Sequence, residues 1–101
     1  MKKLSAALMI LGLLSTSSTV IGADLAAGKA KAATCAGCHG ANGISNNPLW
    51  PNLAGQKAAY LVKQIKAFRD GTRKDPAMEP MAKPLSDTDV ENISAYFESL
   101  K

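Results

Sequence analysis

Two cysteines and the only histidine of this 101-residue chain fall within five consecutive positions, Cys35-Ala36-Gly37-Cys38-His39. The two thiols are three residues apart, and the imidazole follows directly after the second thiol. The sequence contains no other Cys or His, so every soft or imidazole ligand of the chain belongs to this pentapeptide. Any cofactor that uses these groups must therefore be built around one short turn of the backbone.

Cys-x-x-Cys-His is typical of the attachment of a c-type haem. Two thiols at this spacing can reach the two vinyl groups on one edge of a porphyrin and add across them as thioethers. The imidazole of the next residue is then held beneath the iron as its proximal ligand. The pattern predicts one haem c per chain, bound covalently through Cys35 and Cys38 and ligated by His39.

Three other uses of a Cys-x-x-Cys pair fit the sequence less well. A zinc site needs four ligands, and only carboxylates could complete the set here. A thioredoxin-like redox centre needs a βαβ setting, whereas the chain shows no strand alternation. A structural disulfide is possible in an oxidising compartment, but it gives the adjacent His39 no role.

The first 23 residues have the pattern of a secretory signal peptide. Lys2 and Lys3 form its positive start, and Leu4 to Leu14 is an apolar run too short to span a bilayer. Cleavage after Ala23, or one residue earlier, would release the rest of the chain. The residue directly after the cut is not a Cys, so we expect no lipid anchor to a membrane. The sequence predicts export to a bacterial periplasm, where covalent haem attachment takes place.

Residues 24–101 form at most one domain, because they number only 78. A chain this short buries little apolar surface and usually needs a metal or a covalent link to stabilise it. A covalently held porphyrin would serve as both link and centre of the core. We therefore expect the haem-free chain to be largely disordered.

The net charge gives no support to nucleic-acid binding. It falls from +4 to +2 when Lys2 and Lys3 leave with the signal peptide, and two haem propionates lower it further. Basic residues gather between 57 and 74, whereas acidic residues gather between 75 and 98. Solvated helix faces are the ordinary explanation. The alternative is a dipole that steers docking to a redox partner.

Helical periodicity appears in three places and strand alternation in none. The first helix is expected over 25–35, where Gly28 indicates a close crossing with another helix. The second is expected over 56–70, with Gly71 as its stop.

The third helix is expected over 86–100. Ser86 is its predicted N-cap, and Asp89 completes a capping box. Two stretches between the helices, 40–55 and 72–85, are expected to be irregular. The second contains three prolines, which lack the N–H that a regular helix needs.

The second irregular stretch contains Met78 and Met81, the two methionines that follow the predicted signal peptide. A thioether in the sixth position gives a six-coordinate iron with a raised reduction potential, as suits an electron carrier. An open sixth position would instead let small molecules bind.

Several segments follow one another in a recognisable order. They are the haem motif and its continuation at 35–43, Pro-Asn-Leu-Ala-Gly-Gln at 51–56, Met-Glu-Pro-Met at 78–81 and Ala-Tyr-Phe at 95–97. In these segments the chain resembles the small bacterial class I c-type cytochromes. It is most similar to soluble periplasmic monohaem carriers and to single-haem halves of their dihaem relatives. The resemblance covers essentially all of 24–101.

The resemblance implies an all-α class I cytochrome c fold, with three main helices and loops wrapped around the haem. The N- and C-terminal helices are then expected to cross beside the haem, with Gly28 against Tyr96 or Phe97.

The resemblance also implies ligands and contacts of the iron. It makes Met78 the distal ligand, with Met81 as the alternative. It makes the carbonyl of Pro48 the acceptor for the proximal imidazole N–H, with Pro51 second. That hydrogen bond would fix the tautomer and make His39 a stronger donor.

These observations predict a soluble one-electron carrier rather than an enzyme. Expected partners are redox proteins that dock transiently: a membrane cytochrome complex, a terminal oxidase, or a periplasmic reductase or dehydrogenase. We expect a monomer that binds no nucleic acid. Two alternatives stay open: an open-site haem protein that is peroxidase-like or binds a gas, and the electron-accepting subunit of a periplasmic dehydrogenase.

Overall fold

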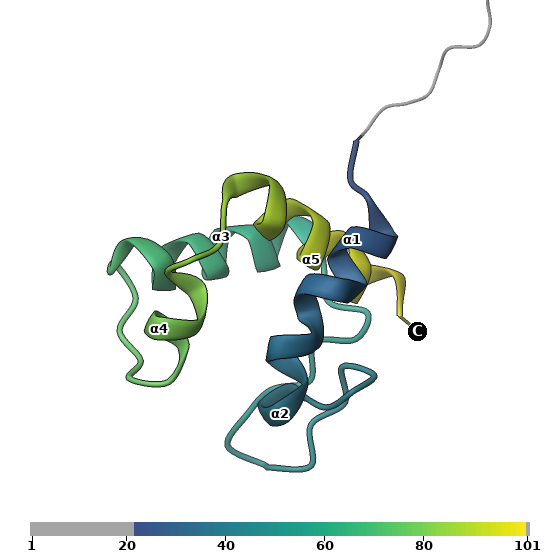
Figure 1. Cartoon of the computed structure of the whole chain (residues 1–101). Helices are drawn as coiled ribbons and strands as arrows, with labels where there is room; N and C mark the ends of the chain where they lie inside the picture. Colours follow the sequence, from purple (N-terminus) through teal and green to yellow (C-terminus); the bar gives the residue numbers. More distant parts are fainter. Residues whose placement is uncertain (1–21, 101) are drawn as a thin grey trace, which may run out of the picture.

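The computed structural model describes residues 22–100, so the expected signal peptide lies outside it except for its last two residues. All regular structure in this range is helical, which confirms the predicted fold class (Figure 1). None of these helices combines the length and apolar character needed to cross a membrane. In chain order the elements are α1 (Leu25–Lys31), the 3₁₀ turn η2 (Ala32–Cys35), α2 (Ala36–His39), α3 (Ala58–Asp70), α4 (Met78–Ala82) and α5 (Asp87–Ser99).

The first and last helices cross at Gly28, as predicted. A Cβ atom at Gly28 would lie 2.0 Å from the backbone oxygen of Asn92 and 3.0 Å from the Cβ of Tyr96. Only a residue without a side chain permits this approach. Asn92 also ties the two helices together, because its Oδ1 accepts from the backbone N–H of Asp24 at 2.8 Å.

The start of α5 is fixed by the predicted capping box. The hydroxyl of Ser86 accepts from the N–H of Asp89 at 3.0 Å, and the Asp89 carboxylate accepts from the N–H of Ser86 at 3.1 Å. Two of the donors that the first turn of a helix leaves unpaired are thereby satisfied.

α3 begins two residues later than the sequence predicts. Lys57 is extended and makes no side-chain cap. The N–H of Ala58 donates instead to Glu98 of α5 at 3.1 Å, so a residue far away in sequence caps this helix. The predicted stop is confirmed, because Gly71 adopts a left-handed conformation with φ of 85°.

A buried apolar cluster joins η2, α3 and α5. Its members are Ala32, Leu61, Ile93 and Phe97. Cys35 is partly buried and packs against this cluster, so the haem motif starts at the core. The core therefore fixes the position from which the rest of the motif extends.

The stretch 72–85 is less irregular than predicted, because it contains the short helix α4. Pro80 is the third residue of that helix. The N–H groups of the first turn have no acceptor within a helix, so a proline there removes no hydrogen bond. The expectation that the prolines exclude a regular helix was therefore wrong at Pro80.

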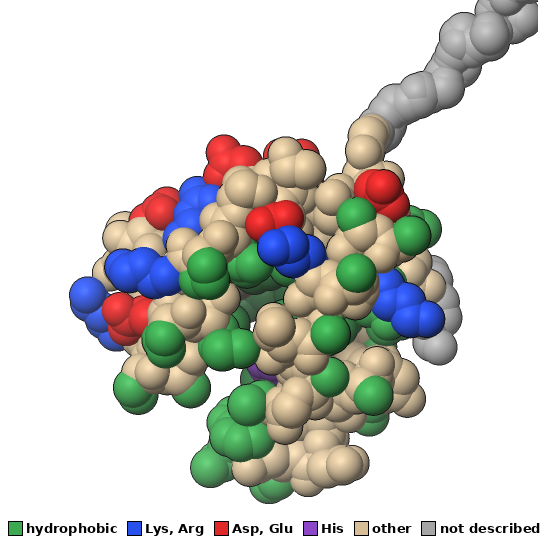
Figure 2. All heavy atoms as spheres, viewed as in Figure 1, with side chains coloured by type: hydrophobic (Ala, Val, Ile, Leu, Met, Phe, Trp, Pro, Cys, Tyr) green, Lys and Arg blue, Asp and Glu red, His purple; other side chains and the backbone are tan. Residues whose placement is uncertain are grey.

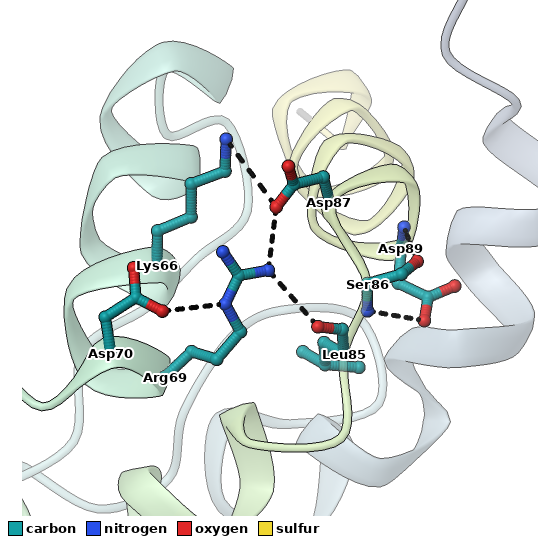
Figure 3. A network of polar contacts seen from close by, with 7 residues as sticks. All are labelled: Lys66, Arg69, Asp70, Leu85, Ser86, Asp87 and Asp89. Carbon is teal, nitrogen blue, oxygen red and sulfur yellow. Dashed lines mark hydrogen bonds and ion pairs between the residues drawn. The ribbon is translucent and has the colours of Figure 1, made fainter.

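A network of polar contacts fastens the linker between α4 and α5 to α3 (Figure 3). The guanidinium of Arg69 donates to the backbone oxygen of Leu85 at 3.2 Å and pairs with Asp87 at 2.8 Å. Lys66 lies 3.9 Å from the same Asp87 carboxylate. Part of the charge on basic α3 and acidic α5 is thus neutralised between the two helices, which weakens any docking dipole.

Candidate haem site

The haem motif is folded into a single helical turn that ends at a glycine. The backbone N–H of Gly40 donates to the carbonyl of Ala36 at 2.9 Å and closes the turn. Gly40 has φ of 90°, and a Cβ there would lie 1.9 Å from the backbone oxygen of Ile44. A side chain at this position would therefore block the reversal of the chain after His39.

The two thiols lie on one side of this turn, because side chains three apart are neighbours on a helix. Both are free: Cys35 is half-buried and Cys38 is exposed. Burial raises the pKa of the Cys35 thiol. A redox-active Cys-x-x-Cys needs a lowered thiol pKa. The raised pKa of Cys35 thus does not match a thioredoxin-like redox centre, and the two free thiols do not form a disulfide.

The imidazole of His39 is held by one hydrogen bond. The side chain is 8% exposed, and its Nδ1 lies 2.8 Å from the backbone oxygen of Pro51. A carbonyl can only accept, so Nδ1 carries a proton, and in the neutral imidazole Nε2 then keeps its lone pair. This is the tautomer that a metal ligand requires.

The acceptor is Pro51, not Pro48 as first expected. Pro48 lies inside a tight turn in which the N–H of Trp50 donates to the carbonyl of Asn47 at 3.0 Å. Pro51 follows the turn, at the point where the loop returns to the haem motif.

The second half of this loop is hydrogen-bonded to the segment that follows His39. Asn52 accepts from the N–H of Ser45 at 2.7 Å through its Oδ1. The N–H groups of Leu53 and Ala54 both donate to the carbonyl of Gly43, at 2.8 and 3.0 Å. These bonds set the Pro51 carbonyl in place.

α2 and α4 extend on the same side of the α3/α5 pair (Figure 1). Figure 2 shows a hollow in this face, with hydrophobic side chains on both sides and the histidine at its floor. A porphyrin needs an apolar recess, two thiols at one edge and a free imidazole nitrogen. Those features are present together, so the residues fit a covalently bound haem.

α4 supplies both methionines. Met78 is half-buried and shares a face of the helix with Ala82, which is 1% exposed. Met81 is 43% exposed. It lines a cavity of about 230 Å³ between α4 and the segment formed by the end of α1 and η2.

The zinc alternative finds no support in residues 22–100. Nowhere in that range do three or more His, Cys, Asp or Glu side chains gather closely enough to hold a metal ion. The three ligand-type residues of the haem motif are thus not part of a larger metal-binding cluster in the described part of the chain.

Comparison with known proteins gives the family. The family model for cytochrome c matches residues 25–101. Cytochrome c-554(548) of Halomonas halodenitrificans is 51% identical over 79 residues, which cover 75% of this chain and 95% of that protein. Cytochrome c4 of Pseudomonas aeruginosa is 46% identical over 100 residues, which cover 99% of this chain and 49% of that protein.

Solved structures agree. The crystal structure of reduced recombinant cytochrome c4 from Pseudomonas stutzeri superposes with a TM-score of 0.75 at 43% identity, covering 79% of this chain and 47% of that one. The chain thus spans about half the length of the cytochromes c4 that it matches.

A further relative is named as the electron acceptor of thiosulfate dehydrogenase, from Thiomonas intermedia. It is 42% identical over 80 residues, which cover 78% of this chain and 37% of that protein. These relatives are named as cytochromes and an electron acceptor rather than as enzymes. The chain belongs to the cytochrome c family and is a class I c-type cytochrome, an electron-transfer protein with one covalently bound haem, similar to one half of a cytochrome c4.

Proposed function

We propose that this cytochrome is a soluble periplasmic one-electron carrier whose iron is ligated by His39 and Met78, with the haem bound through Cys35 and Cys38. The observation that carries the proposal is the bond between Nδ1 of His39 and the Pro51 carbonyl at 2.8 Å. It leaves Nε2 free for iron and makes the imidazole a stronger donor.

When bound, the haem supplies a one-electron change of its iron, and the protein makes or breaks no bond. The chain holds the axial groups in place and keeps water away. The core cluster of η2, α3 and α5 lies directly behind Cys35. Low polarity around the iron and a thioether ligand both favour a raised reduction potential.

Burial supports Met78 over Met81 as the distal ligand. Met78 is half-buried and shares a face of α4 with buried Ala82, whereas Met81 is 43% exposed. The backbone N–H of Met78 is also held by a side chain, as described below.

Export to the periplasm is supported by the charged and apolar pattern of residues 1–23. Covalent haem attachment also takes place outside the cytoplasm in bacteria. Fractionation of cells that produce the full chain tests this: a red protein beginning at Asp24, or within a residue of it, is expected in the periplasmic fraction. A red protein that keeps residues 1–23 would contradict it.

Two point variants test the ligand set. The oxidised wild-type protein is expected to show a low-spin spectrum with the methionine-to-iron charge-transfer band. Met78→Ala should lose that band, lower the reduction potential and admit external ligands. Met81→Ala should keep the band. The opposite pattern would make Met81 the ligand, and a high-spin wild-type spectrum would favour the open-site alternative.

A second candidate role is electron acceptor of a periplasmic dehydrogenase, favoured by the similarity to the acceptor of thiosulfate dehydrogenase. Reduction by a purified enzyme of that class tests it. The rate should change with ionic strength if charge guides the encounter. Reduction no faster than that of an unrelated cytochrome c would rule this role out.

A further inference from the structure

α4 is too short to set its own position. An isolated helix needs about 12–15 residues to be even marginally stable in water, and α4 has five. Its place therefore depends on its packing against α3 and on contacts made at its two ends. Those contacts come from side chains outside the haem motif.

At the start of α4, Asp75 binds two backbone donors with one oxygen. Its Oδ1 accepts from the N–H of Ala77 at 2.8 Å and from the N–H of Met78 at 3.0 Å. Glu79 completes the arrangement, because its Oε2 accepts from the backbone N–H of Asp75 at 3.0 Å. The backbone of Met78 is thus bound directly to a side chain.

At the other end, the chain after α4 is fixed to the rest of the protein. Arg69 donates to the Leu85 carbonyl at 3.2 Å (Figure 3). The backbone N–H of Leu85 donates to the carbonyl of Ala82 at 3.0 Å. Leu85 also packs against the core cluster. Because the C-terminal end is held by these contacts, loss of the Asp75 hydrogen bonds would free only the start of α4.

Resting on the assignment of Met78 as distal ligand, we infer that Asp75 is a positioning residue for that ligand. Its carboxylate fixes the backbone from which the Met78 thioether reaches the iron. Loss of this contact frees the start of α4, so the iron–sulfur bond opens more often while the His39 side stays in place.

Imidazole binding to the oxidised holoprotein measures this opening, because an external ligand binds only when the methionine has left. Asp75→Ala removes the acceptor of these two hydrogen bonds. The cost should be similar to that of losing a helix N-cap, so the apparent imidazole affinity should rise about fivefold. Asp75→Asn keeps an oxygen in the same position and should bind imidazole like the wild type. Recovery with Asn shows that the hydrogen bond, not the charge, is responsible.

Ser86→Ala is the matched control. It removes a cap of the same kind from α5, beyond the point at which Arg69 holds Leu85. It should lower the unfolding temperature about as much as Asp75→Ala does, without raising imidazole affinity. If Asp75→Ala yields no holoprotein, Glu79→Ala removes the other half of the arrangement and should shift the affinity in the same direction by a smaller factor.

Three results would overturn the inference: equal affinity for Asp75→Ala and wild type, failure of Asp75→Asn to recover, or an equal rise in Ser86→Ala. Met78→Ala, titrated alongside, keeps the two proposals apart. If it binds imidazole no more tightly than the wild type, the ligand assignment fails whatever Asp75 does. If it binds much more tightly and Asp75→Ala does not, only the positioning role fails.

Discussion

The segment that carries His39 and the segment that carries Met78 are fixed by different kinds of contact. Around His39 most of the contacts are made by backbone groups. Gly40 reverses the chain, and the carbonyls of Gly43 and Pro51 accept the hydrogen bonds that hold the loop to the motif. Around Met78 the contacts come from the side chains of Asp75 and Arg69.

This difference separates a rigid side of the haem site from an adjustable one. Backbone bonds closed by glycine turns are hard to change by point substitution, except at the glycines themselves. Side-chain anchors can be removed one at a time. We therefore expect substitutions near His39 to decide whether the protein folds around haem, and substitutions near Met78 to tune the reactivity of the iron.

Removal of the haem should have the largest effect. Cys35→Ser combined with Cys38→Ser prevents covalent attachment, and the remaining core is small, because only seven apolar side chains of the described residues are buried. The variant should lose most of its helical circular dichroism. Native-like helicity would show that contacts on both sides of the site form without the cofactor.

Substitution of Gly40 should come next and tests the rigid side. An alanine Cβ would lie 1.9 Å from the Ile44 oxygen at a positive φ, so Gly40→Ala should cost about 2–3 kcal/mol of unfolding free energy. Gly37→Ala is the control, because nothing lies within 4 Å of its Cβ position. Denaturant unfolding of both holoproteins measures the difference. Equal stability would mean that the turn after His39 can relax.

Substitution of Arg69 should have a smaller effect and tests the adjustable side. Arg69→Met removes the contacts with Leu85 and Asp87, and the unfolding temperature should fall by a few degrees. Asp70→Asn removes only the charge that pairs with Arg69 at the end of α3 and should have no effect. A fall as large as that of Gly40→Ala would contradict the distinction between the two sides.

Acid should produce the smallest change. The hydrogen bond from Arg69 lowers the pKa of Asp87, and the backbone N–H of Ser86 lowers the pKa of Asp89, both below the usual 3.8. A carboxylate whose pKa is lowered by folding stabilises the fold at pH values above its usual pKa. That stabilisation is lost as the pH falls through its pKa in the folded protein. These two groups should therefore leave the unfolding temperature nearly constant above about pH 5, and the unfolding temperature should fall below about pH 4. Asp87→Asn should flatten that decline.

The features that could be predicted from the sequence are those determined by residues close to them in the chain. The haem motif, the capping box of Ser86 and Asp89, and the stop at Gly71 each lie within a few residues of their effects. Gly28 was also interpretable, because a glycine inside a helix indicates a close neighbour even when that neighbour is unknown.

The parts that escaped prediction depend on contacts between distant segments. Pro51 replaces Pro48 because Gly43 and Asn52 direct the return of the loop. Glu98 caps α3 from another helix. α4 was missed because a proline was counted as a helix breaker without regard to its place in the first turn. An acidic residue three positions before Met78, followed by Glu79, was the available signal for that helix.

The intact mass of the purified, exported protein under denaturing conditions tests the central claim most directly. We predict the mass of residues 24–101 plus one haem that stays attached after unfolding, and no attached haem when both Cys35 and Cys38 are replaced by serine. A colourless polypeptide with the mass of the bare chain would contradict the account.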